Sequence, residues 1–219
     1  MIDAVVFDLD GLLLETEEIW DEVREALARE RGGRWSESAQ RDMMGMSSPE
    51  WSRYMHDIVG LREPPEEIND LVVERMAERY RSHLPLLPGA VQAVERIAAR
   101  WALAVASSSN RQLIDLVLEL SGLAKHFRAT VSSEEVARGK PAPDVYVEAA
   151  RRLGVEPTRA AAIEDSDAGI RSAAGAGMRV VAIPNRSFPP GEESLARADV
   201  VVDSLADLTP EAVVANGGE

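Results

Sequence analysis

The first apolar run of the chain ends in two aspartates, and this feature constrains the fold more than any other. The run covers residues 2–9, with four consecutive apolar residues from Ala4 to Phe7, and it leads into Asp8-Leu9-Asp10-Gly11. Short apolar runs of this kind are typical of strands buried in a parallel sheet. Such sheets bind ligands beyond the carboxyl ends of their strands, so both acids lie where chemistry is expected.

Strands and helices alternate in the second part of the chain. A helix is expected from Pro88, and further helices lie between strands predicted over residues 102–106, 129–132, 160–163, 179–183 and 199–202. Strands that alternate with helices predict a parallel, doubly wound sheet, that is, a Rossmann-like α/β fold. Asn110 and Ser166 stand where they can cap the helices that follow them.

Residues 15–83 show a different pattern, because helical spacing dominates and no convincing strand interrupts it. One helical segment begins at Thr16, and further helical stretches are expected over residues 36–44, 49–59 and 64–81. We therefore predict an all-helical cap formed by residues 15–83. The Rossmann-like core is then formed by residues 1–14 and 84–219.

The overall charge and the cysteine content limit the classes of partner. The formal net charge of −14 at pH 7 disfavours nonspecific binding to nucleic acid or to an anionic membrane surface. The chain has no cysteine, and its first residues lack the pattern of a signal peptide. No apolar stretch approaches the roughly 20 residues needed to span a bilayer. We expect a soluble, cytoplasmic protein that acts on a small molecule.

Acidic residues also follow a second predicted strand, as the pair Glu164 and Asp165. Together with Asp8 and Asp10 they would place four carboxyl groups at one edge of the sheet, where their repulsion needs compensation. A hard divalent cation supplies it, and Mg²⁺ bound by one or two carboxylates plus a substrate phosphate is the usual arrangement. The pattern therefore favours a magnesium site over a set of solvated loop acids.

Two further segments carry groups suited to phosphate. Ser107 and the neighbouring Ser108 follow the strand over residues 102–106, so hydroxyl and backbone N–H groups there can hold a phosphate oxygen at the start of a helix. Lys140 lies in the loop Arg138-Gly139-Lys140-Pro141, and the only other lysine among the 24 basic residues is Lys125. A lysine at this place in an arginine-rich chain indicates a compact point charge that neutralises phosphate and carboxylate groups.

Four motifs occur in order at these strand ends. They are the segment from Phe7 to Glu17, Ser107, the segment from Gly139 to Asp144, and Glu164-Asp165-Ser166 with Gly169 and Gly175-Ala176-Gly177-Met178. The set resembles the four motifs of the haloacid dehalogenase superfamily, and the match spans nearly the whole chain. It is most similar to the β-phosphoglucomutase-like branch, which carries a helical cap inserted after its first motif.

This resemblance implies a phosphatase that works through an aspartyl-phosphate. Asp8 would be the nucleophile and Asp10 the general acid and base, and splitting hydrolysis into two displacements makes each of them easier. Ser107 and Lys140 would hold the phosphoryl group of a small phosphorylated metabolite. Magnesium would be held by Asp8, the Asp10 backbone carbonyl and Asp165, with Glu164 beside it.

Three cap positions depart from the mutase branch, in which cationic side chains bind the sugar phosphate. The chain has Trp20, Ser48 and Met76 at the matching positions. A mutase must hold a bisphosphate intermediate by its second phosphate, so these residues favour hydrolysis. Arg75 or Arg79 could compensate, and a phosphosugar mutase therefore stays the alternative.

Two further classes are weaker alternatives. A noncatalytic binding module on the same fold is disfavoured by the intact set of acids with Lys140. Dehalogenation is disfavoured by Asp10, because relatives with that chemistry typically lack the second aspartate. The three histidines, at residues 56, 83 and 126, show no metal-ligand spacing and receive no role.

The cap is also rich in large, adaptable apolar side chains. We expect packing between cap helices to explain most of them, and a pocket for a partly apolar leaving group to be the alternative for a few; they are Trp20, Trp35, Trp51, Met43, Met44, Met46 and Met55.

Overall fold

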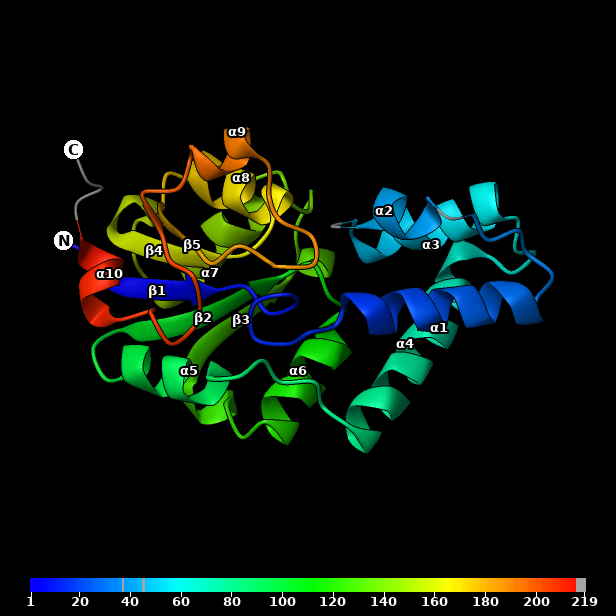
Figure 1. Cartoon of the computed structure of the whole chain (residues 1–219), viewed down its shortest axis with the longest axis horizontal. Coiled ribbons are helices and arrows are strands. Elements are labelled where there is room, and N and C mark those ends of the chain that lie inside the picture. The colour runs from blue at the N-terminus through cyan, green and yellow to red at the C-terminus, as the bar shows by residue number, and fades with distance from the viewer. Residues whose placement is uncertain (37, 45, 216–219) are drawn as a thin grey trace.

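The structure consists of an α/β core and a helical region beside it (Figure 1). It is a computed structural model that describes residues 1–36, 38–44 and 46–215. The N-terminus and the last helix, α10, lie at the end of the core that faces away from the helical region, and β1 points toward that region (Figure 1). The carboxyl ends of the strands therefore face the helices of the insert.

The core contains one sheet of six parallel strands in the order β3-β2-β1-β4-β5-β6. The first strand is central, and Phe7 of β1 pairs with Val105 on one side and Ile163 on the other. Along the chain, β2 and β3 are added on one side of β1, and β4, β5 and β6 are then added on its other side. This change of side is the feature of a doubly wound sheet. The predicted fold class is confirmed. The strands are β1 (Ala4–Phe7), β2 (Ala102–Ser107), β3 (Phe127–Ser132), β4 (Ala160–Glu164), β5 (Arg179–Ala182) and β6 (Val200–Val201).

Helices cover both faces of the sheet because successive strand residues point to opposite sides. Val5 and Phe7 of β1 pack in the apolar cluster that includes α5 (Ala90–Ala98) and α6 (Arg111–Leu120). Val6 packs in a second cluster with α7 (Asp144–Leu153) and α8 (Asp167–Gly175) on the other face. Burial on both faces explains why β1 reads as an unbroken apolar run.

Residues 15–83 form helices, and no strand is found among their described positions. These elements are α1 (Glu17–Glu30), α2 (Ala39–Met43), α3 (Ser48–Tyr54), the π-helical segment η1 (Met55–Val59) and α4 (Pro65–Ser82). The helical cap is thus present as expected. Its division from the core at residues 14/15 and 83/84 stays a prediction. The sequence expectation for residues 36–44 includes residue 37, which lies outside the described residues.

Two expectations about helix starts were wrong in detail. The helix expected from Pro88 begins at Ala90, because Gly89 adopts a φ of +85°, which a helix cannot contain. Asn110 stands before α6, but its side chain makes no capping bond and instead donates to Asn69 and Glu134. The Glu134 carboxylate accepts from the backbone N–H of Arg111 in its place. Ser166 caps α8 as predicted, by accepting from Gly169.

The remaining elements are short and lie mainly on the core surface. They are η2 (Ala124–His126), η3 (Ser133–Glu135), η4 (Pro157–Arg159), α9 (Glu192–Leu195) and α10 (Pro210–Val214). In the part of the chain that the structure describes, no helix combines the length and the apolar character needed to cross a membrane.

Two of the leucines of α6 test which face of this helix stabilises the core. Leu113 is 1% exposed and Leu120 is 44% exposed. We expect Leu113→Ala to lower the free energy of unfolding by about 2–5 kcal/mol, because it leaves a cavity against the sheet. Leu120→Ala should change it by less than about 1 kcal/mol. Urea unfolding measures both, and equal midpoints for the two variants would contradict the assigned face.

Candidate active site

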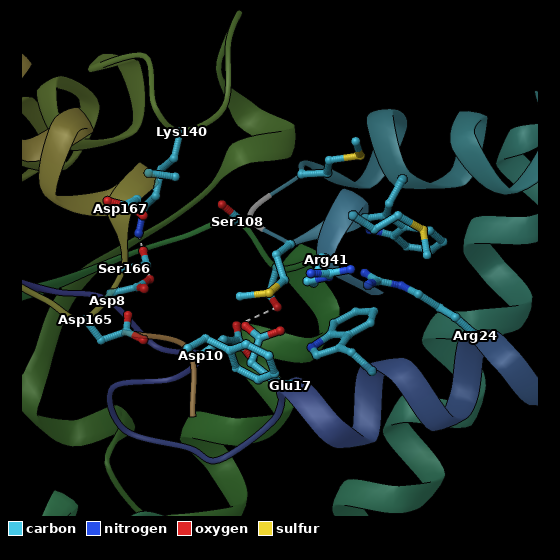
Figure 2. Close-up of a pocket in the computed structure, with 18 of the residues that line it drawn as sticks. Asp8, Asp10, Glu17, Arg24, Arg41, Ser108, Lys140, Asp165, Ser166 and Asp167 are labelled. Atoms are coloured by element: carbon cyan, nitrogen blue, oxygen red, sulfur yellow. Dashed lines mark hydrogen bonds and ion pairs between the residues drawn. The ribbon is translucent and has the colours of Figure 1, made fainter. Parts of the chain in front are cut away.

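A cluster of buried charges lies where β1 and β4 end. Asp8 follows β1, Glu164 ends β4 and Asp165 follows it. Lys140 reaches them from the loop before α7, and Figure 2 shows it beside Asp8 and Asp165. The Lys140 ammonium lies 2.8 Å from Asp8 Oδ1 and 2.6 Å from Glu164 Oε1. Adjacent parallel strands bring these distant sequence positions together, as the pattern of strand ends predicted.

Glu164 is turned toward Lys140 and the protein interior. Its Oε1 also accepts from the Tyr146 hydroxyl at 2.6 Å, and its Oε2 accepts from the Asp165 backbone N–H at 3.1 Å. The residue is fully buried, and Gly169 leaves the room for it, because a Cβ there would lie 1.9 Å from the carboxylate. This arrangement fixes the position of Lys140.

Burial shifts the ionisation of the cluster. It raises the pKa of Asp8 to about 7, with the negative charge of Glu164 adding to the effect and Lys140 opposing it. Burial and then Glu164 also raise the pKa of Asp165 well above its ordinary value. For Lys140, burial is outweighed by Asp8 and Glu164, so its pKa lies above its ordinary value and it is charged. One lysine thus does not balance the surrounding carboxyl groups.

The donor set fits a hard divalent cation. Asp8, Glu164 and Asp165 each offer an oxygen within 4.8 Å of the others. Asp165 Oδ1 is buried and has no hydrogen-bond partner among the described residues. Buried carboxylate oxygens without donors are the ligands that Mg²⁺ prefers. Because Glu164 already binds Lys140 and Tyr146, Asp8 and Asp165 are the better placed of the three as direct ligands.

Asp10 is separated from this cluster by its hydrogen bonds to hydroxyl groups. Its Oδ1 accepts from Thr16 at 2.9 Å, and its Oδ2 accepts from Ser109 at 2.7 Å and from Ser107 at 3.3 Å. These contacts hold its carboxyl group in one orientation beside the cavity. A hydroxyl group can donate or accept, so this shell is compatible with both protonation states of Asp10.

The two serines predicted to bind phosphate differ in position. Ser107 is fully buried. Its hydroxyl donates to Asp10 and accepts from the backbone N–H of Ser109, so it holds Asp10 and this loop in position. Ser108 lines the cavity together with Ser109. Ser108 and Ser109 thus face the cavity directly, and the role of the Ser107 hydroxyl in phosphate binding stays a prediction.

A cavity of about 430 Å³ lies between the charge cluster and the cap. Its core side includes Asp8, Asp10, Lys140 and Asp165 (Figure 2). Its cap side is formed by aromatic, thioether and guanidinium groups and one carboxyl group, namely Trp20, Trp51, Met43, Met44, Met46, Arg24, Arg41 and Glu17. Several of these side chains are also buried in the apolar core, as the packing expectation predicted, and more of them reach the cavity than expected. Only Trp35 and Met55 of that set do not line the cavity.

The cap cations near the cavity differ from those suggested by the sequence. Arg75 pairs with Glu30 at 2.6 Å and Arg79 pairs with Glu22 at 2.5 Å, and neither lines the cavity. Arg24 does line the cavity, although it was not among the residues predicted from the sequence. Its spacing of four residues from Trp20 is a signal, since it places a charge on the apolar face of a predicted helix.

Three more contributors could not be recognised individually from the sequence. Ser109 and Thr16 bind the two oxygens of Asp10, and Tyr146 binds Glu164. Thr16 lies inside the first motif and Ser109 lies two residues after Ser107, so their sequence positions are usable signals. Tyr146 reads only as one of the apolar residues of a predicted helix.

Comparison with known proteins places the chain in a family. The family model of haloacid dehalogenase-like hydrolases matches residues 2–177. The chain belongs to this family. A relative named "Probable pseudouridine-5'-phosphatase" from Drosophila melanogaster is 32% identical over 94% of this chain and 91% of its own length. Hexitol phosphatase B of Escherichia coli K12 is 30% identical, with 94% of each chain covered.

Solved structures show the same architecture. CbbY from Rhodobacter sphaeroides, solved in complex with phosphate, superposes with a TM-score of 0.86 at 29% identity, covering 97% of this chain and 99% of that one. Structures of β-phosphoglucomutases also occur among the similar folds, in agreement with the branch that the motifs resemble.

The raised pKa of Asp8 predicts a pH-dependent contribution to stability. Between pH values near 3.8 and about 7, the folded protein holds a proton on Asp8 that the unfolded chain releases. The free energy of unfolding therefore falls as the pH rises through this window. Asp8→Asn removes this contribution. The difference in melting temperature in EDTA, Asp8→Asn minus wild type, should therefore increase from pH 4 to pH 7. A constant difference would contradict the assignment, and Asp57→Asn at an exposed site is the control.

Proposed function

We propose that the protein is a magnesium-dependent phosphatase that hydrolyses a small phosphomonoester through an aspartyl-phosphate on Asp8. The observation that carries the proposal is the buried pairing of Asp8 with Lys140 beside Asp165, all three lining one cavity with Asp10. Family membership and phosphatase relatives at about 30% identity support hydrolysis of a phosphate ester. The finer roles of individual residues are part of the proposal.

In the first half-reaction, Asp8 attacks the phosphorus atom of the substrate. Lys140 binds Oδ1, so we assign the attack to Oδ2. A bond forms between this oxygen and phosphorus, while the bond from phosphorus to the ester oxygen breaks. Asp10 donates a proton to the departing oxygen, and the alcohol leaves.

In the second half-reaction, water attacks the phosphorus atom of the aspartyl-phosphate. Asp10, now ionised, accepts a proton from this water, inorganic phosphate leaves and the Asp8 carboxylate is restored. The hydroxyls of Thr16 and Ser109 keep Asp10 in place during both steps, because they bind its two oxygens separately. One carboxyl group thus serves as acid and then as base.

Charge neutralisation is shared between Lys140 and a bound cation. Lys140 lies against Asp8 and is available to phosphoryl oxygens in the same cavity. Asp8, Asp165 and the Asp10 backbone carbonyl would hold Mg²⁺, with Glu164 beside it. When bound, the ion reduces the repulsion between the anionic substrate and the Asp8 carboxylate. Glu164 and Tyr146 act indirectly, by holding Lys140.

Phosphosugar mutase activity remains the alternative, but the cap offers it less support. Trp20, Ser48 and Met76 are buried apolar or small residues at the positions where the mutase branch uses cations. Arg75 and Arg79 are paired outside the cavity. The relatives reported above are named phosphatases, so hydrolysis is the better-supported reaction.

Metal dependence tests the proposed function directly. We expect purified protein to release nitrophenolate from p-nitrophenyl phosphate with Mg²⁺ and to lose this activity in EDTA, because Asp8 and Asp165 repel the substrate without a cation. Undiminished turnover after complete chelation would overturn the metal assignment.

The two acids after β4 should respond differently to neutralisation. Asp165→Asn should raise the Mg²⁺ concentration for half-maximal activity at least tenfold, because Asp165 is the proposed direct ligand. Glu164→Gln should instead lower kcat with a smaller change in that concentration, because Glu164 positions Lys140. Identical Mg²⁺ titrations for the two variants would contradict this division of roles.

Removing Asp8 or Asp10 should cause different failures. Asp8→Asn should form no phosphoenzyme, whereas Asp10→Asn should still react with p-nitrophenyl phosphate, because nitrophenolate leaves without a proton. Asp10→Asn should therefore give a burst approaching one nitrophenolate per active site, followed by slow turnover. Stopped-flow absorbance measures the burst. If Asp10→Asn gives neither a burst nor bound phosphate while Asp8→Asn turns over, the two roles are reversed.

A further inference from the structure

Arg24 is a buried cation that has no counterion in the described structure. It lies on α1, is 8% exposed, and lines the cavity opposite Asp8 and Lys140. Its Nε is buried and has no hydrogen-bond partner among the described residues. Figure 2 shows its side chain running from α1 into the cavity, with the Arg41 guanidinium in the same part of it.

Aromatic packing holds the Arg24 side chain in place. Its guanidinium carbon lies 4.6 Å from the centre of the Trp20 ring and 4.8 Å from that of Trp51. Contacts of this kind stabilise a cation over the ring faces and leave its N–H groups free to donate. The two rings therefore orient the guanidinium group without accepting a hydrogen bond from its Nε.

The nearby acids offset only part of the free-energy cost of burying the Arg24 charge. Burial lowers the pKa of Arg24 to about 10, while the charges of Glu17 and Asp21 oppose that effect. No ion pair of Arg24 within 4.0 Å is found among residues 1–36, 38–44 and 46–215, in contrast to the paired Arg75 and Arg79. A buried charge without a partner is strongly unfavourable, so its place on a cavity wall indicates that a ligand supplies the partner.

The shape of the cavity and the chemistry of the guanidinium group limit what that ligand can be. A guanidinium group matches the two oxygens of a carboxylate or a phosphate. A cavity of about 430 Å³ is of a size that accepts a small molecule. Lys140 and the metal-binding acids already account for the phosphate that is cleaved, so Arg24 is available to a second anion.

We propose that Arg24 binds a second anionic group of the substrate, so that the preferred substrates are small phosphomonoesters with a carboxylate or second phosphate remote from the cleaved ester. This inference rests on the proposed function. It also explains how a cap without the cations of the mutase branch recognises an anionic substrate. The recognising charge comes from a different position of the same helix that carries Trp20.

Matched pairs of substrates test this inference. One pair is 3-phosphoglycerate with glycerol 3-phosphate, and a second is 6-phosphogluconate with sorbitol 6-phosphate; each differs by a carboxylate against a hydroxymethyl group. A third pair, fructose 1,6-bisphosphate with fructose 6-phosphate, tests a second phosphate. We expect the wild type to prefer the anion-ended member of at least one pair tenfold or more in kcat/KM.

Variants of Arg24 should remove this preference. Arg24→Met keeps most of the side-chain volume between the two rings, and it should lower the preference at least tenfold, mainly through KM. Arg24→Lys keeps the charge without the fork, so it should give an intermediate value. Arg79→Met is the control on another cap helix, and it should keep the wild-type preference. If no pair shows a preference, or if Arg24→Met lowers both members of a pair equally, the inference is wrong.

A binding measurement separates this inference from the proposed function. In an Asp8→Asn background, tryptophan fluorescence should report binding, because Arg24 contacts two of the four tryptophans. Anion-ended compounds should bind at least tenfold more tightly than their partners, and Arg24→Met should abolish that difference. Equal affinities within every pair would overturn the inference even if the enzyme hydrolyses them. Selective binding without hydrolysis by the wild type would overturn the proposed function alone.

Discussion

A buried lysine surrounded by carboxyl groups is the interaction on which the active-site end of the core depends. The Lys140 side chain is 4% exposed and contacts Asp8 and Glu164, whose side chains are 9% and 0% exposed. Asp165 adds a third buried carboxyl group beside them. Buried carboxylates persist only where they are paired or hydrogen-bonded. With one lysine for three acids, the cluster has more carboxyl groups than Lys140 alone can neutralise, and this favours a divalent cation.

The sheet order explains why this cluster exists at all. β1 and β4 are neighbours although about 150 residues separate them, and Phe7 pairs with Ile163, so the residues that follow each strand lie side by side. Lys140 joins them from the loop before α7, and Tyr146 of that helix donates to the same Glu164 oxygen that binds Lys140. Tertiary structure therefore gives the two neighbouring acids different contacts. Glu164 binds Lys140, whereas Asp165 has one oxygen without a hydrogen-bond donor among the described residues.

Sequence reasoning succeeded where a feature depends on local pattern and strand order. The apolar run at residues 4–7 predicts a central strand, and acids at two strand ends predict their convergence on one edge. It failed where a contact depends on how separate helices pack. Whether Trp20 and Trp51 face each other, at 6.0 Å between ring centres, is decided by the packing of α1 against α3. Likewise, Glu134 rather than Asn110 caps α6, because η3 brings that carboxylate to the helix start.

The two walls of the cavity have unbalanced charges of opposite sign. On the core side, burial and the charge of Glu164 raise the pKa values of Asp8 and Asp165, so a bound cation would favour their ionised forms. On the cap side, Arg24 is a positive charge held on two aromatic rings without an ion pair among the described residues, and this favours an anion. Neither imbalance stabilises the folded chain by itself, since each leaves a buried charge unsatisfied. A metal-bound phosphate ester with a remote anion would satisfy both at once, so ligand binding and closure of the cap over the core would be coupled through the same charges.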